Sequence, residues 1–558
     1  MQPALVFLAL VVASVAYMTD TVVHPYVRQW SSCRVDRVYK PSNVSDVIAI
    51  IQEAYAMERA PLISAMARGM APTFSWCPSE QPDALDRQLP GRLDTHEKWL
   101  IRLPNDAPAG DLSQIEINTE TMEVTAGCGT TLSQVLAVLR QANYSLPFGP
   151  MFSAMSTCGA VVTGAHGSVL KEAATVADLV TAFNVVDGIG NLQTYQKQSA
   201  SKHAVNFGAL GVLTSVTLRI ERRQAATAQT YTLEYTNDTM TTVLDSMIQQ
   251  IESDCTNGQF NWFPEQHKFV LFCIDKIGEA AAAVASRNKT LSDLTAVNYF
   301  FAPQSVADRE AEVQQFDAIV AAQNDTAAFV AQSCATTSYM AQVLTSPYLF
   351  GAGSFPALGY YDRISMSSLC DDLNSCGYQY TVLNGTASAS RRYTNLDVSV
   401  PLDRLGDILV DFERQRFSRF DGACLASYGV SLHVRLMNSP GKALLGPTRG
   451  KRAVLEIATH IPSHTLASRE QAMQDTLAGK SQFQPPQSSQ FESERQIRDP
   501  RGLFNIEFVR NFVVTHRDDT LDLSYDGCGI TGHCVCSMQS HCGPTGRCLS
   551  NGACEHAA

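Results

Sequence analysis

The most informative stretch of the chain is STCGAVVTGAHGS, residues 156–168. Glycines and other small residues surround one histidine, so main-chain N–H groups can come close to a large ligand, as binding of a diphosphate or a flavin ring requires. The spacing is not the GxGxxG fingerprint, and by itself the stretch fits a glycine-rich turn between core strands equally well. The residues that we expect to contact a cofactor here are Thr157, Cys158, Gly159, Thr163, Gly164, His166, Gly167 and Ser168.

A second tight turn lies upstream, where ARGMAP, residues 67–72, follows a strand-like run. Its main-chain amides could hold a phosphate group in the same way. The candidate cofactor contacts in this turn are Arg68, Gly69, Met70, Ala71 and Pro72.

Strand and helix patterns alternate around both turns. A helical pattern covers 47–56, with Ser45 as the expected N-cap, and a second helix is expected over 132–143. Strands are expected at 61–64, near Glu116, at 122–126 and at 211–220. Residues 34–223 are therefore predicted to form one α/β domain.

The pattern changes from about residue 224. Strand-like segments at 230–235, 260–263 and 269–273 are followed by an Ala-rich helical pattern at 310–331, which predicts a second, α+β domain over 224–485. A polar stretch, 481–489, reads as a linker. An ordered turn, DPRGLF at 499–504, follows it within a segment, 486–515, that we expect to return to the first domain.

The cysteines divide into two groups. Ten of the sixteen are scattered, and six crowd into the tail at Cys528, Cys534, Cys536, Cys542, Cys548 and Cys554. Because Gly, Ser, Thr and His dominate between them, residues 526–556 suit a small disulfide-linked module. A zinc site is the other interpretation, but the paired Cys-x2-Cys spacing is absent, and no metal is expected.

The amino terminus and the composition indicate a secretory route. Residues 1–16 form an apolar run ending in small residues, as in a cleaved signal peptide, although a short membrane anchor has a similar pattern. Sequons are present at Asn43, Asn143, Asn237, Asn288, Asn324 and Asn384. The 558-residue chain has a net charge of -12 and no long basic run, so we expect small-molecule partners, no nucleic acid, and no stable membrane span after signal cleavage.

Taken in order, these segments resemble the FAD-binding domain of the vanillyl-alcohol-oxidase superfamily. The family's first loop corresponds to 68–71, its second to 159–168, and its closing strand to 209–216, which contains Val212. The stretches NWFP at 261–264 and DP at 499–500 resemble sugar-lactone oxidases, and the tail from 526 is similar to that of plant gulonolactone oxidases. The resemblance implies an α+β protein with a PCMH-type two-lobed FAD-binding domain, a substrate (cap) domain built on an antiparallel sheet, and a small cysteine-rich module.

Two departures from the family pattern concern the cofactor. Many relatives carry a histidine that bonds covalently to the flavin where this chain has Met70. A thioether cannot form that link, so we expect FAD to bind noncovalently. Cys158 stands where relatives have Gly or Ala against the flavin ring, and its bulk could hinder oxygen; a buried or disulfide-bonded cysteine is the other interpretation.

The resemblance also implies catalytic residues. Sugar-lactone oxidases use an Arg, often in Glu-x-Arg, and the matching strand is VSLHVRL at 430–436, which makes Arg435 the candidate and puts His433 in place of the Glu. Strand alternation places both on one face, and His433 can act as a base; a surface arginine is the alternative for Arg435. Thr459 matches a substrate-contacting strand, and Lys480 is the nearest counterpart of the lysine in a His-Trp-Gly-Lys motif that is not intact here.

The sequence thus predicts a secreted FAD-dependent oxidoreductase. By resemblance it oxidises an aldono-1,4-lactone at carbon 2 by hydride transfer to the flavin, with an ascorbate-type product and electrons passing to O2, giving H2O2, or to another acceptor. Two alternatives stay open. One is a carbohydrate or alditol oxidase on the same scaffold, and the other is a secreted glycoprotein that has lost activity, for which the altered motifs are the evidence.

Overall fold

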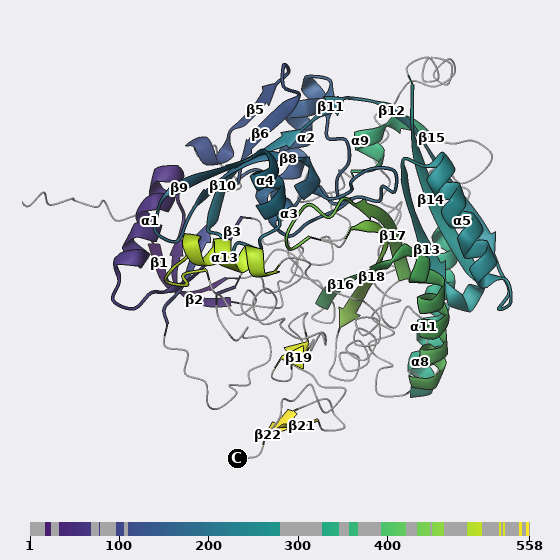
Figure 1. Cartoon of the computed structure of the whole chain (residues 1–558). Coiled ribbons are helices and arrows are strands. Elements are labelled where there is room, and N and C mark those ends of the chain that lie inside the picture. Colours follow the sequence, from purple (N-terminus) through teal and green to yellow (C-terminus); the bar gives the residue numbers. More distant parts are fainter. Residues whose placement is uncertain are drawn as a thin grey trace, which may run out of the picture.

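The described residues of the computed structural model form three sheets of four or more strands, three two-stranded sheets, and the helices that pack on them (Figure 1). The residues described are 17–23, 33–67, 77–78, 96–104, 110–278, 326–344, 357–366, 392–419, 424, 432–446, 449–461, 488–504, 524–525, 528–529, 546–548 and 554–556. The predicted signal peptide, most of the predicted linker and most of the cysteine-rich tail lie outside them.

The first sheet is small and mixed. Its strand order is β1 (Tyr17–Val23), β2 (Cys33–Tyr39), β4 (Lys98–Arg102), β3 (Leu62–Met66), and only β1 pairs antiparallel. Helix α1 (Val44–Ala56) connects β2 to β3 and buries Val47, Ile50 and Ile51. The predicted N-cap was wrong: Asn43, not Ser45, caps this helix, because the Asn43 Oδ1 accepts the Asp46 N–H at 2.9 Å.

The second sheet is antiparallel and carries the cofactor-binding segment. Its order is β5 (Ile115–Asn118), β6 (Glu123–Gly127), β10 (Val212–Arg219), β8 (Val180–Val186), β9 (Leu192–Gln196). Helices α2 (Leu132–Gln141), α3 (Thr157–Val162) and α4 (Lys197–His203) accompany it. Thr131 and Gln134 form a capping box at the start of α2. The strands predicted near Glu116 and at 122–126 and 211–220 are thus present, as is the helix predicted from 132.

The third sheet has seven antiparallel strands. Their order is β15 (Ala357–Tyr360), β12 (Ala225–Glu234), β14 (Lys268–Ile277), β13 (Asn257–Phe263), β17 (Leu432–Ser439), β18 (Gly450–Ile461), β16 (Arg392–Pro401). Helices α5 (Met240–Asp254) and α11 (Leu405–Arg419) lie on its outer side (Figure 1), and α8 (Thr326–Leu344) contacts the turn Pro264–Gln266 that follows β13. The helix expected at 310–331 continues to Leu344, and residues 310–325 lie outside the described part.

Alternation along the third sheet separates two cores. Phe260, Trp262 and Leu455 pack with helices α5 and α11, whereas Phe263 and Phe272 pack with the FAD-binding domain. The inner face of the sheet is therefore the face on which a site shared with the cofactor-binding segment can form.

The segment after the predicted linker packs against the first two sheets. Helix α13 (Ser488–Arg498) already includes the last two residues of that linker. Both carboxylate oxygens of Asp499 accept main-chain N–H groups, from Leu503 at 2.8 Å and Phe504 at 2.9 Å. The Leu503 carbonyl in turn accepts the N–H of Ile63 on β3 at 2.6 Å. This turn thus joins the end of α13 to the FAD-binding domain.

Four disulfides lie within the described residues. They are Cys33–Cys77, Cys128–Cys158, Cys255–Cys273 and Cys334–Cys424. The tail contributes four short strands, β19 (Ser524–Tyr525), β20 (Cys528–Gly529), β21 (Gly546–Cys548) and β22 (Cys554–His556). Among the helices that the structure describes, none has the length and apolarity needed to span a bilayer.

Candidate active site

The glycine-rich stretch begins as a short helix and ends as an extended segment. Helix α3 (Thr157–Val162) begins at the second residue of the stretch, and Gly164, just past its end, has a positive φ of 69°, a conformation that favours glycine. Gly167 is required for a different reason: a Cβ at that position would lie 2.8 Å from the Gly149 carbonyl oxygen. The segment is therefore pressed against the loop before it, and its small residues are a packing requirement.

A neighbouring loop supports the end of α3. The N–H groups of Asn206 and Phe207 both donate to the Val162 carbonyl, at 3.2 and 3.1 Å. The Asn206 Oδ1 accepts the N–H of Gly208, which has a φ of 79° and open space where a side chain would be. Val212, four residues on, is fully buried in β10.

The polar cluster of the cap lies on the inner face of the third sheet. His433 and Arg435 are two residues apart on β17, and the register pairs them with Asn261 and Gln259 on β13 and, for His433, with Glu456 on β18. Directly paired residues share a face of the sheet. All five side chains are buried, and Arg435 is only 8% exposed, so it is not a surface arginine.

Short polar contacts, one of them an ion pair, connect these cap side chains to one another. The Nδ1 of His433 lies 2.9 Å from the Glu456 Oε2, and the Nε of Arg435 lies 3.3 Å from the same oxygen. The Nε2 of His433 lies 3.3 Å from the Gln259 Oε1. Glu456 therefore holds both predicted catalytic residues of β17 from the adjacent strand.

The same cluster contacts the glycine-rich segment. The Nη1 of Arg435 donates to the His166 carbonyl at 3.3 Å, and the Ser168 hydroxyl donates to the Gln259 Oε1 at 3.1 Å. Residues 164–166 remain partly exposed beside this contact, and Thr163 is exposed. The structure thus brings the cofactor-binding segment and the catalytic candidates of β17 together, although 267 or more residues separate His433 and Arg435 from His166 in sequence.

Burial and the arginine fix the charges of the cluster. Burial alone would raise the pKa of Glu456, but the Arg435 charge and the His433 hydrogen bond outweigh it and lower this pKa below its usual range. Burial lowers the pKa of His433, although the Glu456 carboxylate opposes the shift. Burial and Arg435 lower the pKa of His166 to about 3. Near neutral pH, Glu456 and Arg435 are therefore a charged pair beside two neutral histidines.

The residues present fit a large flat cofactor. Beside the cap cluster, Gly164 and Ala165 are small and residues 164–166 are partly exposed, and open space adjoins Gly208 in the loop at the end of α3. A flavin ring needs such a surface on one side, with polar side chains on the other. The backbone of 159–166 and of 206–208 would hold it, so the described residues are compatible with bound FAD.

The remaining predicted site residues are placed as follows. Thr459 lies on β18, paired with Thr394 and three residues beyond Glu456. Cys158 is bonded to Cys128, so it carries no free thiol and the disulfide interpretation holds. Predicted residues outside the described part are Arg68, Gly69, Met70, Ala71, Pro72 and Lys480.

Sequence reasoning missed Glu456, Gln259 and Cys128. Glu456 lies three residues before Thr459 on the same strand, and an acidic residue within an apolar strand was a signal that could have identified it. Gln259 lies two residues before the NWFP stretch and carried no comparable signal.

The chain carries an FAD-binding domain and has the fold of proteins with a PCMH-type FAD-binding domain. The family model described as the FAD binding domain matches residues 109–196, which cover β5 through β9. The fold is similar to that of cholesterol oxidase from Brevibacterium sterolicum, with a TM-score of 0.61 and 14% identity over 89% of this chain and 97% of that one.

Sequence comparison finds relatives among lactone oxidases. The chain is 22% identical to L-gulonolactone oxidase 3 of Arabidopsis thaliana over 78% of this chain and 76% of that protein. Identity to the D-arabinono-1,4-lactone oxidase of Candida albicans is 21% over 47% of this chain and 44% of that protein. The chain is therefore a distant relative of the sugar-lactone oxidases.

Proposed function

We propose that the protein is a secreted enzyme that oxidises the carbon 2 hydroxyl of an aldono-1,4-lactone with noncovalently bound FAD. The observation that carries the proposal is the buried Glu456–His433–Arg435 cluster in contact with the FAD-binding segment. The names of the lactone-oxidase relatives support the substrate class.

FAD, when bound, supplies a hydride acceptor. The chain's own task is to hold the lactone, take the hydroxyl proton and stabilise the negative charge that develops on oxygen. Hydride leaves carbon 2, the proton goes to a base, and the product is a 2-keto lactone that can enolise to an ascorbate-type enediol. The electrons pass on to O2, giving H2O2, or to another acceptor.

His433 is the base in this proposal, and Glu456 orients it. A neutral imidazole that donates its Nδ1–H to the Glu456 carboxylate keeps a lone pair at Nε2, which is the arrangement of a carboxylate–histidine base pair. The Gln259 Oε1 lies 3.3 Å from this Nε2, and because an amide oxygen and an imidazole lone pair are both acceptors they cannot bond in this tautomer, so Gln259 turns away when the substrate hydroxyl takes its place. The lysine counterpart, Lys480, and Thr459 stay predictions for substrate contacts.

Arg435 stabilises the developing oxyanion. Its guanidinium is buried, so its field on a nearby oxygen is weakly screened, and one well-placed donor contributes about 3 kcal/mol in comparable oxyanion sites. Glu456 also supplies a carboxylate next to Arg435, although the chain lacks the usual Glu two residues before the Arg. The altered motif therefore keeps the charge pair of an active site, which favours an enzyme over an inactive glycoprotein.

Anaerobic mixing tests the substrate class. The purified yellow protein is mixed with L-gulono-1,4-lactone or with an alditol, and the loss of oxidised-flavin absorbance is followed. The proposal expects bleaching with the lactone and little with the alditol. Bleaching with the alditol alone would make the protein an alditol oxidase, and no bleaching with any sugar would contradict an enzymatic role.

Acid precipitation tests the cofactor linkage, and terminal sequencing tests secretion. We expect flavin in the supernatant, because Met70 cannot form the covalent link. We also expect a eukaryotic secretory host to release protein whose first residue is Tyr17. Flavin in the pellet, or an intact amino terminus, would contradict the respective part of the proposal.

A further inference from the structure

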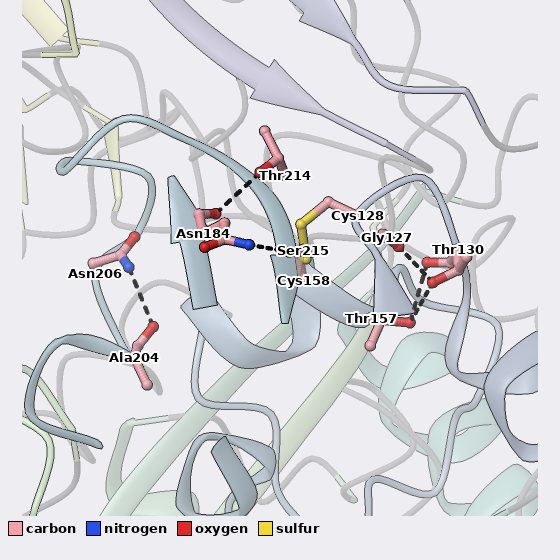
Figure 2. The surroundings of a disulfide bond; sticks show 10 residues. All are labelled: Gly127, Cys128, Thr130, Thr157, Cys158, Asn184, Ala204, Asn206, Thr214 and Ser215. Atoms are coloured by element: carbon pink, nitrogen blue, oxygen red, sulfur yellow. Dashed lines mark hydrogen bonds between the residues drawn. A yellow bond between two sulfur atoms is a disulfide. The ribbon is translucent and has the colours of Figure 1, made fainter. Parts of the chain in front are cut away.

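The Cys128–Cys158 disulfide joins the cofactor-binding segment to the second sheet (Figure 2). Cys158 is the second residue of α3, and Cys128 lies in the turn that follows β6. The Cys128 N–H donates to the Thr214 carbonyl on β10 at 2.9 Å, so the bridge leads to the central strand of the sheet. Both cysteines are buried, at 1% and 6% exposure.

The turn that holds Cys128 cannot easily move. A Cβ on Gly127 would lie 2.4 Å from the Leu112 carbonyl, and one on Gly129 would lie 2.4 Å from the Pro104 carbonyl. Such close backbone packing on both sides of Cys128 makes the turn a rigid anchor. The disulfide therefore holds Cys158 at a fixed position relative to this turn.

Hydrogen bonds alone hold the start of α3 less firmly. The Thr157 N–H donates to the Thr130 carbonyl at 2.9 Å, and the two threonine hydroxyls lie 3.1 Å apart, as Figure 2 shows. However, α3 has six residues, and its N-cap, Ser156, makes no side-chain capping bond. A helix this short has little stability of its own and depends on tertiary anchors.

We propose that the Cys128–Cys158 disulfide is a cofactor-positioning element that fixes α3 and residues 159–166 in their FAD-binding conformation before FAD arrives. Its second support is the 206–208 loop at the other end of α3. A preformed site loses less conformational entropy on binding, so the bridge raises the affinity for FAD. The inference rests on the proposed noncovalent binding, because a protein without a covalent flavin link retains FAD only through its binding affinity.

The test compares two double variants in the apo protein. C128A/C158A removes this bridge, and the matched control C255A/C273A removes the bridge between the end of α5 and β14, which packs with the helices on the outer face of the cap sheet. FAD affinity is measured from the quenching of flavin fluorescence. We expect roughly tenfold weaker binding for the first variant and less than about a twofold change for the control.

Hydrogen exchange provides a readout independent of turnover. Amides of 159–166 should be protected in the wild-type apo protein, and in C128A/C158A they should gain protection only when FAD binds. Equal affinity and equal exchange in wild type and variant would overturn the inference. If C128A/C158A does not fold, the wild-type apo protein decides the question by itself. Rapid exchange of amides 159–166 in that protein overturns the inference, and protection of these amides supports it.

The two proposals can fail separately. Flavin that stays in an acid pellet would contradict noncovalent binding, whereas the exchange pattern of the apo protein would still test the disulfide. A general loss of stability would lower the unfolding temperature of both double variants, so it cannot imitate an affinity loss confined to C128A/C158A.

Discussion

Replacing Glu456 by glutamine keeps the side-chain volume and removes the charge that Arg435 and His433 share. One Glu456 oxygen lies 2.9 Å from the His433 Nδ1 and 3.3 Å from the Arg435 Nε, and these side chains are 7 to 10% exposed. Because no cavity forms, the loss of folding stability comes from the Arg435 charge, which is left buried without the Glu456 carboxylate.

The expected cost is large for one isosteric change. Removing one partner of a buried ion pair costs about 3–5 kcal/mol. The glutamine oxygen can still accept the His433 N–H, so the lower end, about 3 kcal/mol at neutral pH, is the expected value. A matched control is Glu252→Gln, whose partner Lys451 lies 2.8 Å away on the exposed surface, where such pairs contribute at most about 1 kcal/mol.

The stability difference between wild type and E456Q should be largest at neutral pH and should shrink in acid. The folded pKa of Glu456 is lowered, so its contribution is fully present above the ordinary value of 4.5 and is lost as the pH falls through the folded pKa. The wild type should therefore approach E456Q in stability only below about pH 4.5. His433 and His166, whose folded pKa values are also lowered, destabilise both proteins below about pH 6.5, and because the Glu456 carboxylate opposes both shifts, this destabilisation at low pH is larger in E456Q and acts against the narrowing.

Thermal unfolding of the apo proteins from pH 7 to pH 3.5 measures the effect, with E252Q in parallel. A gap between wild type and E456Q that is large at pH 7 and narrows below pH 4.5 supports the charge assignment. A gap that stays constant with pH, or that is no larger than the gap for E252Q, would refute it.

Three further changes test other parts of the site. Arg435→Lys keeps the positive charge but loses the planar guanidinium that reaches both Glu456 and the His166 carbonyl, so the rate of lactone-dependent flavin reduction should fall about a hundredfold. The control is Arg452→Lys, at an arginine bonded to Ser399, and it should change that rate by no more than a few fold. Equal losses in the two variants would contradict the role of Arg435. Gln259→Met removes the contacts to both Ser168 and His433, whereas Ser168→Ala leaves the histidine contact in place. Because Gln259 has to leave the His433 Nε2 before substrate binds, Gln259→Met should slow flavin reduction no more than Ser168→Ala does, and a clearly slower reaction in Gln259→Met would show that Gln259 positions the base. Asp499→Ala leaves the buried N–H groups of Leu503 and Phe504 without their acceptor, which destabilises the fold by about 1–3 kcal/mol for each group. Proteolysis of the turn after α13 should therefore be faster than in the control variant Asp407→Ala, which changes an exposed residue. An unchanged rate of proteolysis would mean that other contacts hold the turn.

Local patterns predicted the parts of the site that lie within one element. His433 and Arg435 share a face because strands alternate, and this follows from two positions in one strand. Three strands of the second sheet, β5, β6 and β10, were likewise predicted from local pattern, whereas β8 and β9 were not. The N-cap of α1 shows the limit of local patterns: Asn43 and Ser45 are both competent caps, and only the observed bond to Asp46 distinguishes them.

Contacts between elements could not be predicted in the same way. Glu456 reaches His433 only because β18 pairs with β17 in one register, and a shift of one residue would turn it to the other face. Ten scattered cysteines allow many pairings, so Cys128–Cys158 required the fold. Both features depend on long-range packing, which spacing along the chain does not encode.

Main-chain hydrogen bonds as well as side chains join the FAD-binding segment to the sheet of the cap domain. The Gly258 N–H donates to the Ser168 carbonyl and the Asn438 N–H to the Val169 carbonyl, both at 2.8 Å. These bonds flank the contacts of Arg435 and Gln259 to the same segment. Backbone bonds survive side-chain substitution, so changes at Arg435 or Gln259 should alter charge and proton transfer while the distance between segment and sheet stays fixed. The site therefore combines a position set by main-chain bonds with a chemistry set by a few buried side chains.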